Sequence, residues 1–176
     1  MSSTADNAAL FETWLEEHRG IVVKVTRSFA PEAADAADLQ QELLLQLWMS
    51  VPAYAGQAKP STWIYRVCLN TALTWRRGTA RRERHLQPGA DYTRVAADAG
   101  SPADSAGDRE LLDQLYAAIR ALPGSDRVLV LLSLDGLAYR EIAEITGLTE
   151  NQVGVALTRA RKRLAELMKG VSHELE

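Results

Sequence analysis

The chain has 176 residues, a formal net charge of −3 and 47% hydrophobic residues, which suits one soluble domain or two small ones. Cys68 is the only cysteine and the three histidines are scattered, so we expect no disulfide framework, no metal site and no cofactor. No apolar run approaches the roughly 20 residues that cross a bilayer. The acidic N-terminus lacks the cations of a secretion signal, and a cytoplasmic location without membrane insertion is therefore predicted.

Charge is distributed unevenly along the chain. Residues 59–85 contain seven bases and one acid, and residues 158–170 contain five bases and one acid. The segments 1–58 and 91–150 are acidic. Nonspecific binding to nucleic acid depends on the phosphates that are neutralised locally rather than on net charge. Two basic segments in an acidic chain are therefore compatible with DNA binding.

The N-terminal part is predicted to form three helices. The first covers residues 7–19, and we expect Gly20 to break it before a second helix over residues 21–29. The third begins at Asp35 or Asp38 and continues to Ser50, because Pro52 stops it.

The third of these helices has more apolar residues than one buried face needs. Leu39, Leu43 and Leu47 form the buried stripe. The additional apolar side chains are Leu44, Leu45, Trp48 and Met49, and the polar side carries Asp38, Gln41, Glu42 and Gln46. Such a helix either lies inside a bundle or offers a docking surface to a partner, and the pattern leaves both interpretations open.

A loop over residues 53–60 is followed by a long helix, which Ser61 or Thr62 is expected to cap. Its predicted inner face consists of Ile64, Val67, Cys68, Thr71, Ala72 and Trp75. Trp63, Tyr65 and Arg66 cluster at its start. Aromatic rings beside cations are typical of a surface that stacks unpaired bases, but also of ordinary helix packing.

Residues 86–108 are rich in small residues, Pro, Gly and Asp, and we interpret them as a flexible linker. The linker separates an N-terminal domain, about residues 1–85, from a C-terminal domain, about residues 109–170. The latter begins with a helix over residues 110–122, and Ser125 is expected to cap the next one. We find no strand pairs with hairpin signals, so the predicted fold class is all-α with two small helical domains.

The segment 137–168 is typical of a helix-turn-helix. Its first helix covers about residues 138–146, and Gly147 supplies the left-handed backbone that ends it. Thr149 is expected to cap the second helix, with Gln152 completing a capping box. The inward residues of this helix are Val153, Ala156, Leu157, Ala160, Leu164 and Leu167. Polar outward residues precede a run of cations, which favours base contacts followed by phosphate contacts over a plain αα-hairpin with a solvated basic face.

These segments together resemble a bacterial RNA polymerase sigma factor of the extracytoplasmic-function group. DLQQELLLQLW resembles the family's polymerase-clamp helix, and STWIYRVCLNTAL followed by arginines resembles its promoter-melting helix. The stretch from LPGSDRVLVLL to TRARKRL is similar to its −35-reading domain. The resemblance covers most of the chain and implies a C-terminal helix-turn-helix domain. It also implies a protein that binds core polymerase and directs promoter recognition, DNA melting and transcription initiation, without a catalytic residue.

The resemblance implies three sets of binding residues and several partners. The polymerase-binding set, facing the beta-prime clamp helices, is Asp38, Gln41, Glu42, Leu45 and Trp48. The set at the −10 element, where the 53–60 loop would take a flipped base, is Tyr54, Lys59, Trp63, Tyr65, Arg66, Asn70, Thr74, Arg77 and Arg81. The set at the −35 element is Arg140, Glu150, Asn151, Gln152, Val155, Thr158, Arg159, Arg161, Lys162 and Arg163. The implied partners are core RNA polymerase, including its beta flap, promoter DNA and an anti-sigma factor.

The chain departs from the family pattern at a few positions. Gly154 and Ala156 stand where family members often have a Lys and an Arg, and Pro60 stands where an aromatic residue is frequent. These departures remove cations from the recognition helix and one stacking side chain from the −10 region.

Two other function classes compete with this interpretation. A helix-turn-helix transcription regulator that is not a polymerase subunit would share residues 137–168, but it would not need the apolar third helix or the Trp63-to-Arg84 helix. A small nuclease would need paired carboxylates beside a basic groove, and the sequence shows no such pattern. A sigma factor binds core polymerase without DNA, whereas such a regulator need not. Cleavage of DNA in the presence of Mg²⁺ would favour the nuclease.

Overall fold

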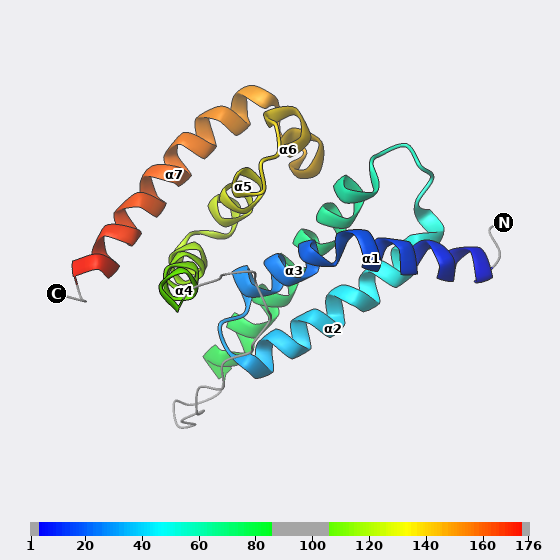
Figure 1. The fold of residues 1–176 in the computed structure, drawn as a ribbon, viewed down its shortest axis with the longest axis horizontal. Helices are drawn as coiled ribbons and strands as arrows, with labels where there is room; N and C mark the ends of the chain where they lie inside the picture. Colours follow the sequence, from blue (N-terminus) through cyan, green and yellow to red (C-terminus); the bar gives the residue numbers. More distant parts are fainter. Residues whose placement is uncertain (1–3, 86–105, 174–176) are drawn as a thin grey trace. The chain divides into compact units, whose positions relative to one another are not determined.

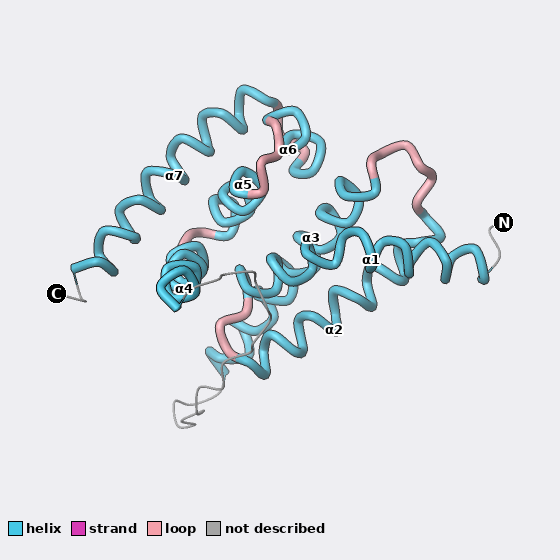
Figure 2. Tube along the Cα trace, in the orientation of Figure 1, coloured by secondary structure: helices cyan, strands magenta, loops and turns pink. Residues whose placement is uncertain are grey.

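The structure is a computed structural model that describes residues 4–85 and 106–173. The described residues form seven α-helices and one short 3-10 helix, with no strand among them (Figures 1 and 2). Contacts divide the chain into two compact units, residues 1–97 and 98–176. The predicted linker lies largely outside the described residues. Its last three residues are an exception, because a helix already begins at Ala106.

The N-terminal unit contains three long helices, α1 (Thr4–Phe29), α2 (Ala33–Ser50) and α3 (Pro60–His85), with the 3-10 helix η1 (Val51–Ala53) after α2. Each of the three helices packs against the other two (Figure 1). The core is filled from all of them. Its members include Trp14, Ile21, Val25, Phe29, Leu39, Leu43, Leu47, Ile64, Tyr65 and Leu69.

The predicted break at Gly20 is wrong, because α1 continues through it. Gly20 is exposed, and the buried residues Trp14, Ile21, Val25 and Phe29 form one stripe that crosses the glycine without a change of period. A glycine in a helix costs about 1 kcal/mol relative to alanine. Burial of this stripe on both sides of residue 20 exceeds that cost, so the helix remains continuous.

We expect Gly20→Ala to stabilise the N-terminal unit by about 1 kcal/mol, because alanine favours the helix and no atom lies within 4 Å of the added Cβ. Urea unfolding followed by tryptophan fluorescence measures this, since Trp14, Trp48, Trp63 and Trp75 all belong to this unit. The control is Gly147→Ala, where a φ of 76° strains any side chain. It should leave the fluorescence transition unchanged and cost the other unit about 1 kcal/mol, which far-UV circular dichroism follows. A loss of stability for Gly20→Ala would contradict this account of α1.

Cys68 belongs to the core of α3 and is fully buried. Burial raises the pKa of the Cys68 thiol from about 9 to about 12. The thiolate that reacts with alkylating reagents is therefore scarce at pH 8, and the rate should rise with pH. We expect the folded protein to resist iodoacetamide and the urea-unfolded protein to react at the rate of a free thiol. Rapid labelling of the folded chain would contradict the core position.

The C-terminal unit contains α4 (Ala106–Ala121), α5 (Gly124–Leu134), α6 (Tyr139–Thr146) and α7 (Glu150–His173). Helix α7 packs against the other three. A cluster of Ile119, Leu122, Val130 and Ala160 joins α4, α5 and α7. The predicted cap at Ser125 is wrong, because α5 begins at Gly124 after an extended Pro123.

One cation lies inside this unit. The side chain of Arg127, on α5, is only 2% exposed. Its Nη2 donates to the carbonyl oxygens of Arg120 and Leu122, the latter at 3.0 Å. Arg120 lies in the last turn of α4, where backbone carbonyls have no partner within the helix. Arg127 therefore caps α4 from the neighbouring helix and fixes the angle between the two.

Candidate functional site

The outer side of α2 carries an exposed apolar group. The predicted stripe Leu39, Leu43 and Leu47 is buried, which leaves Leu45, Trp48 and Met49 with 48%, 38% and 63% of their surface exposed. We call these three residues the α2 apolar patch. Monomeric proteins seldom leave three large neighbouring apolar side chains in water without a binding function.

The polar residues around the α2 apolar patch differ in solvent exposure and in hydrogen bonding. Asp38 and Gln41 are exposed, whereas Glu42 is half-buried and its Oε1 accepts a hydrogen bond of 2.9 Å from Gln46. Trp48 is held from α1, because its ring meets the ring of Phe11 edge-on with centroids 5.4 Å apart. Trp48 is therefore a supported part of the patch and not a loose side chain.

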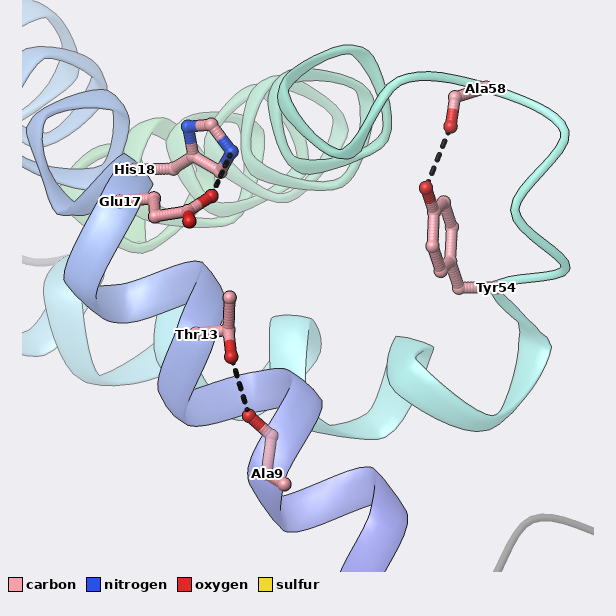
Figure 3. Close-up of polar contacts among 6 residues, drawn as sticks. All are labelled: Ala9, Thr13, Glu17, His18, Tyr54 and Ala58. Atoms are coloured by element: carbon pink, nitrogen blue, oxygen red, sulfur yellow. Dashed lines mark hydrogen bonds and ion pairs between the residues drawn. The ribbon is translucent and has the colours of Figure 1, made fainter.

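Residues 54–59 form the loop between η1 and α3 (Figure 2). Aromatic contacts hold this loop. Tyr54 lies between Trp14 and Trp63, with ring centroids 5.2 Å and 5.6 Å away. Its hydroxyl donates to the carbonyl oxygen of Ala58 at 2.7 Å across the loop (Figure 3). In addition, Nε1 of Trp63 donates to Oγ of Ser50 at 3.1 Å. These two predicted base-contacting aromatics thus shape the loop from inside.

Two expectations about α3 need correction. Neither Ser61 nor Thr62 caps the helix, because it starts at Pro60, whose fixed φ and missing N–H suit a first helical position. Tyr65, assigned to base contacts, is only 2% exposed and belongs to the core. Leu69, absent from the predicted inner face, is also buried. Helix α3 packs against both α1 and α2, so its buried arc is wider than a single stripe.

The remaining predicted residues of α3 lie in one exposed row. Arg66, Asn70, Thr74 and Arg77 are all exposed and are spaced by four, four and three residues, which places them on one side of the helix. Arg77 donates to Oγ1 of Thr74 at 3.2 Å. Lys59 is exposed just before the helix begins. Arg81 continues the spacing, but its side chain lies outside the described residues.

An open cleft lies between this row and α2. It is lined by Glu42, Gln46, Asn70, Thr71, Thr74 and Trp75. The cleft therefore connects a residue assigned to polymerase binding with two residues assigned to the −10 element, Asn70 and Thr74.

The helix-turn-helix is present as predicted. Helices α6 and α7 are joined by three residues. Gly147 adopts the left-handed conformation with φ of 76°, and its N–H donates to the carbonyl oxygen of Ala143 at 2.9 Å. The capping box is also confirmed. The N–H of Thr149 donates to Oε1 of Gln152 at 2.9 Å, and the N–H of Gln152 donates to Oγ1 of Thr149 at 3.2 Å.

Burial divides α7 into two faces. Val153, Leu157 and Ala160 are fully buried, and Ala156, Leu164 and Leu167 are partly buried, as the periodicity predicts. The exposed residues of the first three turns are Glu150, Asn151, Gln152, Val155, Thr158 and Arg159. Both ends of this face are fixed, one by the capping box and the other by packing on α5, so it can be presented as a rigid unit.

Several of the predicted phosphate-binding cations bond within the protein. Arg163 forms an ion pair with Asp126 in the first turn of α5, and Arg161 donates to Oγ of Ser133 at 2.6 Å. On α6, Arg140 pairs with Glu144 at 3.7 Å across one exposed turn. Arg159 and Lys162 are exposed. Arg161 and Arg163 therefore attach α7 to α5, a role that the spacing on α7 alone did not indicate.

The described residues include no group of three or more His, Cys, Asp or Glu that could hold a metal ion. None of the helices within the described ranges has the length and apolarity needed to cross a membrane.

Two family models match the chain. Sigma-70 region 2 matches residues 14–82, and sigma-70 region 4 matches residues 112–164. The ECF RNA polymerase sigma factor SigE of Mycolicibacterium smegmatis is 30% identical, and the alignment covers 98% of this chain and 67% of SigE. SigG of Mycobacterium tuberculosis is 31% identical over 80% of this chain but only 44% of SigG, so the chain spans less than half of that relative.

Solved structures share the fold. The sigma factor RpoE of Bartonella quintana, solved in complex with the anti-sigma factor NepR, matches with a TM-score of 0.68 and 23% identity over 90% of this chain and 96% of RpoE. CnrH, solved with the cytosolic domain of CnrY, matches with a TM-score of 0.66 and 18% identity over 94% of this chain and 92% of CnrH.

Proposed function

The chain belongs to the extracytoplasmic-function sigma factors of bacterial RNA polymerase, and we propose that its two units divide promoter recognition between them. As a sigma factor it binds core RNA polymerase and promoter DNA and directs transcription initiation. We assign polymerase binding and the −10 element to residues 1–85, and the −35 element to residues 109–170. The observation that carries the assignment is the exposed polar face of a capped, packed helix α7 in a unit separate from the α2 apolar patch.

Polymerase binding is assigned to the outer side of α2. Leu45 and Trp48 supply the apolar surface that drives association, and Asp38, Gln41 and Glu42 surround it with groups that can bond to cations of a clamp helix. We expect the beta-prime clamp helices to bind here. Met49, which the sequence interpretation left out of the set, is the most exposed residue of the α2 apolar patch and extends the same surface.

The −10 element is assigned to the exposed row of α3 and the adjoining loop. Arg66 and Arg77 provide cations for the backbone of one strand, and Asn70 and Thr74 provide hydrogen-bonding groups between them. The loop at residues 54–59 keeps its shape through Tyr54, so a base leaving the duplex can be captured without first ordering the loop. Strand opening is then driven by capture of unpaired bases and requires no covalent step. We therefore assign no catalytic residue.

The −35 element is assigned to the first turns of α7. In a helix-turn-helix the second helix enters the major groove with its N-terminal residues at base edges. The exposed residues at those positions are Asn151, Val155, Thr158 and Arg159. We expect the beta flap of polymerase to hold this unit at the correct spacing, and the whole reaction to take place in the cytoplasm, where template DNA is found.

An anti-sigma factor is the expected regulator. RpoE and CnrH were each solved with a partner protein, and that of RpoE is an anti-sigma factor. We propose that a protein of this kind covers the α2 apolar patch of this chain and thereby competes with core polymerase. The support is that all three side chains of the patch are exposed and that Trp48 packs against the ring of Phe11.

Run-off transcription tests the proposed function. The purified full-length chain is added to core RNA polymerase on a library of promoter fragments, and transcripts are sequenced. We expect initiation from a subset with shared upstream and downstream elements, and none without the chain. Core enzyme that neither binds the chain nor initiates on any template would contradict the proposal.

A further inference from the structure

We propose that Val155 is a specificity-determining residue that reads the C5-methyl group of a thymine in the −35 element. The inference rests on the proposed function, because it requires α7 to enter the major groove of promoter DNA. Thymine is the only base that displays a methyl group in that groove, and small apolar side chains recognise it by contact.

The position of Val155 is the first argument. Its side chain is 54% exposed, and it is the only large apolar residue exposed in the described part of α7. Residues three and four positions away share its side of a helix. Those four neighbours, all exposed, are Asn151, Gln152, Thr158 and Arg159. An apolar contact therefore stands at the centre of a hydrogen-bonding surface.

The bonding of the neighbours is the second argument. Gln152 uses its Oε1 in the capping box, so it cannot pair with adenine through both amide atoms unless the cap breaks. The hydroxyl of Thr158 donates to the carbonyl oxygen of Gly154 at 2.8 Å. Two of the four polar neighbours thus have part of their bonding capacity committed inside the protein, which increases the share of base discrimination left to Val155.

The space around Val155 is the third argument. Gly154 has no side chain, and a Cβ placed on it would lie 3.4 Å from the ring of Tyr139. Ala156, on the other side, is small and partly buried. Neither flanking residue can therefore reach over the valine. A β-branched side chain in a helix has essentially one rotamer, so its methyl groups are presented without loss of conformational entropy.

The experiment combines a protein change with a DNA change. Holoenzyme is assembled from core polymerase and the full-length chain, and its affinity is measured for a promoter obtained in the run-off selection. Each thymine of the −35 element is replaced in turn by deoxyuridine, which lacks only the methyl group. For the unmodified chain we expect a loss of about fourfold at one thymine, the value of one buried methyl group.

The holoenzyme with Val155→Ala should bind unmodified DNA about fourfold more weakly than the unmodified holoenzyme does. Its affinity should not fall further when deoxyuridine replaces that thymine. Val155→Thr, which keeps one methyl group, should retain part of the response. Leu134→Ala is the matched control, since Leu134 is 56% exposed on α5 and should leave every deoxyuridine effect unchanged.

The inference would be overturned if the −35 element contained no thymine, if deoxyuridine had equal effects with and without Val155, or if Val155→Ala weakened binding to core polymerase in the absence of DNA. The last outcome would identify a protein contact. A chain that supports no initiation at all would instead overturn the proposed function, so the two failures are distinguishable.

Discussion

Replacement of Arg127 by alanine is expected to destabilise the C-terminal unit by about 3–5 kcal/mol, a large part of the stability of a small domain. The substitution removes the donors for the carbonyl oxygens of Arg120 and Leu122. It also leaves a cavity, because Arg127 is the largest of the fully buried side chains. Both costs arise where α4 meets α5, so the C-terminal unit as a whole should be affected.

Two spectroscopic signals separate the units in this experiment. All four tryptophans lie in the N-terminal unit, so fluorescence follows that unit during urea unfolding, whereas far-UV circular dichroism follows the helices of both. We expect Arg127→Ala to leave the fluorescence transition unchanged. In the dichroism signal, only the unfolding of the C-terminal unit should move to lower urea concentration. An equal shift of both signals would mean that the two units unfold together.

Two further variants divide the effect into packing and hydrogen bonding. Arg127→Met restores most of the volume without donors, and Arg127→Lys restores a charge and donors without the planar fork. We expect both to be less destabilising than alanine, by about 1–2 kcal/mol. If Arg127→Met were as stable as the unmodified chain, the cap on α4 would contribute nothing and our account of this arginine would be wrong.

Simultaneous replacement of Leu45 and Trp48 by alanine should weaken binding to core polymerase about 100-fold, because large apolar side chains at the centre of an interface dominate its affinity. Leu45 is almost half exposed, so its truncation should leave the fold intact. Trp48 also packs on Phe11, and its loss should cost about 1 kcal/mol of stability through that ring contact. Binding is measured with fluorescently labelled chain and purified core enzyme, without DNA.

Two controls identify the cause of the loss. Leu111→Ala removes a similarly exposed leucine, 58% exposed on α4, and should leave affinity unchanged. Leu43→Ala, in the buried stripe of the same helix, should instead reduce stability by about 2–5 kcal/mol. Undiminished binding by the Leu45/Trp48 variant would place the polymerase contact elsewhere. Because the test contains no DNA, it also separates a sigma factor from a helix-turn-helix regulator that acts without joining polymerase.

The buried faces of the helices could largely be predicted from the sequence. The stripes Leu39–Leu43–Leu47 and Val153–Leu157–Ala160 were both found, because one helix face against one core produces a simple period of three and four. The capping box and the left-handed Gly147 were also found, since both depend on residues within one turn of each other.

Features that depend on more than one helix were missed. Tyr65 and Leu69 are buried because α3 has two neighbours, and their spacing of four, continued by Ala72 after three more, was the available signal. Gly20 was judged from its own propensity, and the seven-residue spacing from Trp14 to Ile21, which fits a continuous helix, was not used. Local rules were outweighed by tertiary packing in both cases.

The same distinction holds for the functional surfaces: features within one helix could be predicted, and contacts between helices could not. The exposed row on α3 follows from spacing, but the internal bonds of Arg161 and Arg163 could not be predicted, because nothing on α7 indicates that Ser133 and Asp126 lie beside it. Arg127 gave a weak signal, as a lone cation within an apolar run, and its partners on α4 are visible only once the two helices are in place.

The bonding of the cations in the C-terminal unit has a consequence for the ionic strength at which the promoter can be bound. Arg163 is paired with Asp126 and Arg140 with Glu144, whereas Arg161 bonds only to the neutral hydroxyl of Ser133. Arg159, Arg161 and Lys162 are therefore the cations of the helix-turn-helix that form no ion pair within residues 106–173. Each phosphate contact releases close to one counterion, so three contacts give a slope of only about −3 in a plot of log K against log salt concentration. Upstream recognition by this chain should therefore survive salt concentrations that dissociate more heavily charged DNA-binding domains.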